Sequence, residues 1–160
     1  MKQKTRMWVI LALMPILFAC FTSCGYPGDD VRYSIGTYTH YEWYTSGGFQ
    51  DYTDYGKFYY DTVDFSQNRY FQKLTPSEMV TLQEHLDDFE GWVALHSTND
   101  DATELVIHYD FDRTIIDCED YLYMESELHT RRDGTTSLVN YNIHFFDTQS
   151  NTLYYFHNNI

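Results

Sequence analysis

TPSEMVTLQEHLDDFEGWV, residues 75–93, is the stretch of this sequence with the clearest helical periodicity. Thr75 is a favourable N-cap residue, Pro76 suits the first helical position, and Glu78 stands at the capping-box position. Apolar side chains then recur at spacings of three and four residues (Met79, Leu82, Leu86, Phe89, Val93). This pattern predicts an amphipathic helix whose apolar stripe packs against another part of the fold.

The segments on both sides of this helix alternate between apolar and polar residues, as half-buried strands do. The alternation is clearest at residues 139–145, where every second residue is apolar (Val139, Tyr141, Ile143, Phe145). Further strands are expected at residues 31–43 (or a hairpin bent near Gly36), 57–65, 69–74, 105–111, 114–118, 121–125 and 153–157, with a loop at 49–56. Strands before and after one helix predict an α+β fold, with an antiparallel sheet of about six to eight strands and one amphipathic α-helix packed against it.

The N-terminal residues have the layout of an export signal rather than of a folded element. Lys2, Lys4 and Arg6 form a basic region, and residues 8–18 follow as an uncharged, mostly apolar run. A helix that spans a bilayer needs roughly 20 apolar residues, so this run is short for that purpose.

Two cysteines after this run change the class of signal. Residues 17–20 (LFAC) and 21–24 (FTSC) each resemble the lipobox of bacterial lipoproteins. In that family the cysteine thiol is diacylated and the signal is cut just before it. The resemblance covers about the first two dozen residues and implies lipidation of Cys20, which has Leu17 and Ala19 before it, with Cys24 as the alternative. A plain secretory signal or an uncleaved anchor is the competing interpretation.

The resemblance also implies how the chain is organised. Residues 1–19 (or 1–23) would be the lipoprotein signal peptide, residues 20–30 a lipidated tether, and residues 31–160 a single extracytoplasmic α+β domain. The lipid would consist of covalent diacylglycerol and fatty acyl groups, such as palmitate, on the lipobox cysteine, and no other cofactor is expected. Because two acyl chains give stable anchoring, the protein is expected at the cell membrane, facing the extracytoplasmic side.

The charge of the folded part limits its partners. The formal charge of the chain is −14, but three of its ten basic residues lie in the leader, whereas all 24 acidic residues lie at or after Asp29. The remainder therefore carries 7 basic and 24 acidic residues and a charge of −17. Such a field repels nucleic acid and suits solubility or a basic partner. The 16 Tyr and 11 Phe favour a folded, sheet-rich domain.

Few residues are candidates for catalysis, because the common nucleophile, phosphate-binding and metal motifs are missing from the sequence. His108, Asp110 and Asp112 would project from one face of the strand expected at residues 105–111. His144 lies on the polar side of another expected strand. These four side chains could form a weak metal or acid-base site, and the alternative is that they are ordinary solvent-facing residues.

A second candidate site is a surface of tyrosines. Five tyrosines fall in expected loops or off the main apolar alternation (Tyr38, Tyr44, Tyr52, Tyr55, Tyr60). Exposed aromatic rings are common in glycan and protein recognition, although many tyrosines of such a sheet need no ligand. Beyond the lipobox pair the chain has one cysteine, Cys118, which could pair with Cys24 if Cys20 is lipidated.

These features favour a non-catalytic surface binding or interaction module that contacts an envelope protein or a glycan. A metal-dependent or acid-base hydrolase that uses the His/Asp strand face is one alternative. An inhibitor-like or protective envelope protein that binds a basic partner is the other.

Overall fold

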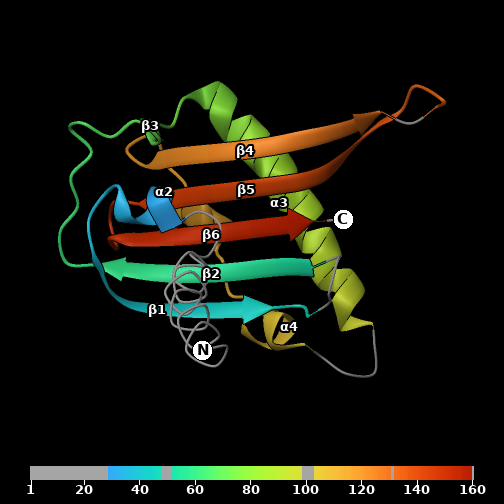
Figure 1. The fold of residues 1–160 in the computed structure, drawn as a ribbon, viewed down its shortest axis with the longest axis horizontal. Coiled ribbons are helices and arrows are strands. Elements are labelled where there is room, and N and C mark those ends of the chain that lie inside the picture. The colour runs from blue at the N-terminus through green and yellow to red at the C-terminus, as the bar shows by residue number, and fades with distance from the viewer. Residues whose placement is uncertain (1–28, 48–51, 99–102, 131, 160) are drawn as a thin grey trace, which may run out of the picture.

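A six-stranded antiparallel sheet forms the centre of the protein (Figure 1). The computed structural model describes residues 29–47, 52–98, 103–130 and 132–159. The strands are β1 (Tyr38–Thr45), β2 (Tyr52–Tyr60), β3 (Gln72–Lys73), β4 (Tyr121–Thr130), β5 (Thr136–Asp147) and β6 (Thr152–Asn159), in the spatial order β1-β2-β6-β5-β4-β3. The expected signal peptide and both lipobox cysteines lie outside the described residues. Within those residues, none of the helices has the length and apolarity needed to cross a membrane.

One long helix, α3 (Pro76–Ser97), covers the first face of this sheet, which confirms the predicted α+β fold (Figure 1). Its capping box is formed: the Glu78 backbone N–H donates to the Thr75 hydroxyl, and the Thr75 N–H donates to the Glu78 carboxylate. Leu82, Leu86 and Phe89 are fully buried and pack with the sheet in one apolar cluster. The helical stripe of the sequence is therefore the contact surface.

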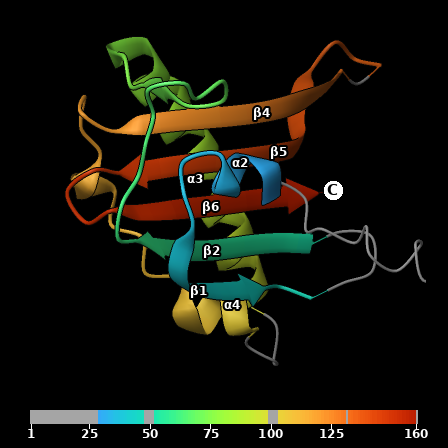
Figure 2. The ribbon, with the colours of Figure 1, turned by 60° about the vertical axis from the view of Figure 1, so that its left-hand side comes forward.

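The second face of the sheet is covered by chain from before α3 (Figure 2). The short helix α2 (Asp29–Tyr33) and the connection between β2 and β3 lie over this face. Val31 and Ile35 from the N-terminal side are buried in a second apolar cluster with sheet residues that include Phe58 and Tyr155. The sheet is thus covered on both faces, and each face has its own apolar cluster.

The expected strand at residues 105–111 is wrong. These residues form the single-turn helix α4 (Glu104–His108) and an extended segment that leads to the 3₁₀ helix η1 (Arg113–Ile115). A strand would place Leu105, Ile107 and Phe111 on one face, but Ile107 is 64% exposed while Leu105 and Phe111 are buried. The segment crosses the first face beside α3, so apolar residues find burial without joining the sheet.

Other expected boundaries also shift. Residues 52–56, expected in a loop, belong to β2, which pairs with β1 on one side and β6 on the other. Residues 31–33 are helical, strand 57–65 ends at residue 60, and the expected strand at 69–74 shrinks to the two residues of β3. Residues 114–118 form no strand. Tertiary pairing overrides local preference in a central strand such as β2, even where Gly56 and Asp54 disfavour a strand locally.

Removal of the Phe89 ring should test the packing of α3. Because Phe89 is fully buried against Phe156 and Tyr109, Phe89→Ala is expected to lower the free energy of unfolding by about 3–5 kcal/mol. Val80 lies on the same helix and is 60% exposed, so Val80→Ala serves as the control and should change stability by less than about 0.5 kcal/mol. The measurement is urea unfolding followed by circular dichroism. Equal effects of both substitutions would contradict the packing.

Candidate functional site

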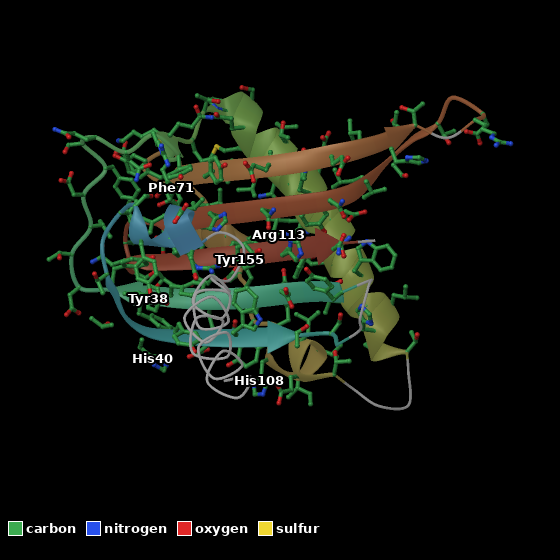
Figure 3. All side chains as sticks on the ribbon, viewed as in Figure 1. Tyr38, His40, Phe71, His108, Arg113 and Tyr155 are labelled. Atoms are coloured by element: carbon green, nitrogen blue, oxygen red, sulfur yellow. The ribbon has the colours of Figure 1, made fainter. Side chains whose placement is uncertain are left out.

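The four residues considered for catalysis do not come together. His108 ends α4 and stacks on Tyr44 with ring centroids 4.4 Å apart, whereas His144 contacts Tyr155 in the second cluster, on the other face of the sheet. Figure 3 shows His108 beside β1, far across the molecule from Phe71, another ring that His144 contacts. The strand expected to carry His108, Asp110 and Asp112 on one face is not formed.

The two aspartates of that set have structural contacts. Asp110 accepts hydrogen bonds from the Tyr55 hydroxyl and from Lys57 Nζ, each at 2.9 Å, and so ties the segment after α4 to β2. Asp112 caps η1 by accepting the Thr114 N–H. Among the residues that the structure describes, no group of three or more His, Cys, Asp or Glu could hold a metal ion. The hydrolase alternative therefore loses its proposed site.

The five tyrosines of the expected binding surface are scattered. Tyr55 and Tyr60 are buried core residues on opposite faces, so the expectation that they lie on an exposed surface is wrong. Their side chains alternate along β2, which has neighbouring strands on both sides. Tyr44 packs beside His108 on the first face, and Tyr52 contacts His157. Tyr38 lines a pocket.

That pocket lies on the second face, between α2 and the outer strands, and has a volume of about 260 Å³. Its lining consists of four aromatic rings and one ion pair (Tyr38, Tyr41, Trp43, Phe58, Asp29, Arg32). We refer to it as the aromatic pocket. Sequence reasoning had selected only Tyr38 from this set.

A shift in strand register places three of these rings together. Strict alternation along β1 would put Tyr38 and Tyr41 on opposite faces, because they are an odd number of residues apart. The pairing of β1 with β2 shifts between Tyr38 and His40, so that Tyr38 lies opposite Tyr60 and Tyr41 lies opposite Phe58. This bulge-like irregularity turns both side chains, with Trp43, toward the same face.

A glycine makes room for the rings. Gly56 lies opposite Trp43 in the β1–β2 pairing. A methyl group at Gly56 would come within 3.1 Å of both the Trp43 and the Phe58 rings. Any side chain at this position would therefore push the rings away from the strand, and the residue that weakens β2 locally is the one that the pocket requires.

Arg32 of α2 is the central polar group of the aromatic pocket. Its side chain is 1% exposed, and its guanidinium carbon lies 4.8 Å from the centroid of Phe58, 5.3 Å from Tyr155 and 5.5 Å from Trp43. Nη2 forms an ion pair with Asp29 at 2.6 Å. Nε and Nη1 are buried and have no hydrogen-bond partner among the described residues.

The pKa values of two ionisable groups near Arg32, Tyr38 and His144, are shifted in the direction that favours their uncharged forms. Burial and the hydrogen bond with the Tyr33 hydroxyl raise the pKa of Tyr38 to about 12. His144 is buried among aromatic rings, and neither of its ring nitrogens has a hydrogen-bond partner in the described part of the chain. Burial, and then the charges of Arg32 and His157, hold the pKa of His144 well below its ordinary value. Arg32 and Asp29 thus dominate the field in the pocket.

No family model, curated protein or solved structure matches this chain.

His144 should make the stability depend on pH. The unfolded chain binds a proton at His144 near pH 6.5, whereas the folded protein resists it, so acidification below about pH 6.5 favours unfolding by up to 1.4 kcal/mol per pH unit for this group. We expect His144→Phe, which retains an aromatic ring, to lose less stability than the parent between pH 7.5 and pH 5.5. His157, whose pKa burial also lowers, is present in both proteins and cancels in the comparison.

The measurement is urea unfolding at pH 7.5, 6.5 and 5.5. His129→Phe is the control, because His129 is exposed on β4, and it should retain the pH dependence of the parent. Parallel curves for the parent and His144→Phe would show that His144 is not the group that resists protonation.

Proposed function

We propose that this chain is an exported lipoprotein and a non-catalytic binding module, whose ligand occupies the aromatic pocket. The observation that carries the binding role is the pocket itself: an open cavity of about 260 Å³ lined by four aromatic rings and the Asp29–Arg32 pair. Binding sites typically combine apolar walls with a few placed polar groups, and this pocket has that composition.

The exposure of the lining residues supports access by a ligand. Tyr41 is 54% exposed, and Tyr38 and Trp43 are partly exposed. Aromatic rings with one accessible side offer large contact area at a low cost in conformational entropy. A structural core has no need of such half-covered rings, since Phe58, Tyr60 and Tyr155 already bury the centre of this face.

The lipobox-like sequence supports the anchor and would hold the pocket close to a membrane. Asp29 lies five positions after Cys24 and nine positions after Cys20. A fully extended chain spans at most about 3.6 Å per residue, so the tether would reach no more than about 18 Å or 32 Å, respectively. The pocket would then sample ligands within a few tens of ångströms of the bilayer.

The anchor is tested by metabolic labelling of the full chain with palmitate in a bacterial host. We expect label in the parent, loss of label in Cys20→Ser, and retention in Cys24→Ser. Cys118→Ser is the control and should retain the label, because Cys118 lies in the folded domain. Loss only in Cys24→Ser would move the anchor to Cys24, and an unlabelled parent would disprove the lipoprotein proposal.

Binding is tested with the full chain in detergent and a panel of neutral sugars, sugar acids, phenols and aromatic acids. A ligand at about 100 times its Kd stabilises a protein by about 2.7 kcal/mol, which raises the Tm by several degrees. We expect at least one class to do so for the parent, and Tyr41→Ala to weaken its binding by about tenfold or more.

Tyr70→Ala is the matched control for the binding experiment. Tyr70 is a partly buried tyrosine of the same face, but it contacts Arg69 and Tyr123 and does not line the pocket. Its variant should bind like the parent. A panel without any binder, or equal binding by Tyr41→Ala and the parent, would refute the pocket as the site.

A further inference from the structure

The aromatic pocket contains hydrogen-bond donors that lack acceptors. Arg32 is 1% exposed, and its Nε and Nη1 groups have no hydrogen-bond partner within the described ranges. Buried donors are nearly always paired, and each exception in a native protein calls for an explanation, such as a bound group. The contact with three aromatic rings compensates part of the charge but accepts no N–H in the plane of the guanidinium.

We propose that the aromatic pocket binds the carboxylate of a small ligand with one flat ring, and that Arg32 donates to this carboxylate. The inference rests on the proposed binding function and specifies its ligand. A carboxylate supplies the missing acceptors, because its two oxygens accept N–H groups and form charge-assisted hydrogen bonds with a guanidinium. Its flat body packs against Tyr41 and Trp43, the rings at the open side of the pocket.

A cationic ligand fits this pocket poorly, although aromatic rings often bind cations. The guanidinium of Arg32 already lies over the rings of Phe58, Trp43 and Tyr155, so it already occupies the cation–π position on these rings. A second positive group would be repelled by Arg32 at short range. It would leave Nε and Nη1 without acceptors.

The negative charge of the domain favours a singly charged ligand. Asp29 lies 2.6 Å from Arg32 and already balances one positive charge, and the folded part of the chain carries many more acidic than basic residues. Exposed charges beyond about 8 Å are screened at physiological ionic strength, so the local field depends mainly on Arg32 and Asp29. The Asp29 carboxylate therefore repels a ligand that carries more than one negative charge. A doubly charged phosphate would meet more repulsion than a carboxylate.

The size of the pocket favours a ligand with a single ring. Small-molecule pockets usually have volumes of about 300–1,000 Å³, and 260 Å³ lies just below this range. Two sources share the required chemistry: an aromatic acid, whose ring stacks on Tyr41 or Trp43, and a uronic acid, whose apolar C–H face packs on the same rings. The experiment has one arm for each.

The test is calorimetric titration of the full chain in detergent with matched pairs of probes. 4-Hydroxyphenylacetate is compared with 4-hydroxyphenylacetamide, and the methyl glycoside of glucuronic acid with methyl glucoside. We expect one acid to bind at least about tenfold more tightly than its neutral partner, and Arg32→Gln to remove this difference. Tyr41→Ala should weaken binding of the acid, and Tyr70→Ala should leave the affinity for the acid unchanged.

Each outcome decides the proposal. If acid and amide, or acid and glucoside, bind equally and depend on Tyr41, the carboxylate is wrong while the pocket remains a binding site. If neither acid binds, the ligand class is wrong, and the proposed function stands or falls on the wider panel. Should Arg32→Gln fail to fold, as judged by circular dichroism, the comparison of acid with neutral probe on the parent still decides.

Discussion

A sheet that carries large apolar rings on both faces has to be covered on both faces. The strands of this protein alternate one set of aromatic and aliphatic residues toward α3 and another set toward α2. At about 25 cal/mol for each Å² of apolar surface removed from water, neither face could remain open without a large cost. The placement of every other element follows from this requirement.

The two faces are covered in different ways, and the difference produces the pocket. The first face is covered by 22 residues of α3, by α4 and by the segment up to η1. Of the described residues, the second face receives the five residues of α2, the turn after it that contains Ile35, and the connection after β2. A five-residue helix is too short to close the outer strands. The rings of β1 therefore stay partly open where α2 ends.

The helix and its cap were predictable because their signals are local. Thr75, Pro76 and Glu78 mark where the helix begins, and the spacing of the apolar residues indicates which face of the helix is buried. The alternation at residues 139–145 also predicted a strand correctly, since β5 and its neighbours pair in regular register. Residues 105–111 alternate in the same way but form no strand, because alternation is also compatible with a segment that crosses a sheet and buries Leu105 and Phe111.

The candidate site depended on signals that are not local. Tyr41 joins Tyr38 only because the register of β1 shifts, and a register shift is a property of two strands. Arg32 falls within residues 31–43, where a half-buried strand was expected, and alternation gives no reason to expect its burial. Its burial results from helix α2, which brings it onto rings from β1, β2 and β6. A lone arginine before a strand carries no sequence signal of such an environment.

The position of α2 has a mechanical consequence. It is the first element of the described chain, and Asp29 and Arg32, within its five residues, both line the pocket. Any force transmitted along the preceding residues would enter the fold through this short helix, before it reached the sheet. The β1–β2–β6 ladder resists such a load through many backbone hydrogen bonds, whereas α2 is held by side-chain contacts. Tension applied to the N-terminal side of α2 would therefore act on the lining of the cavity before it acted on the strand ladder.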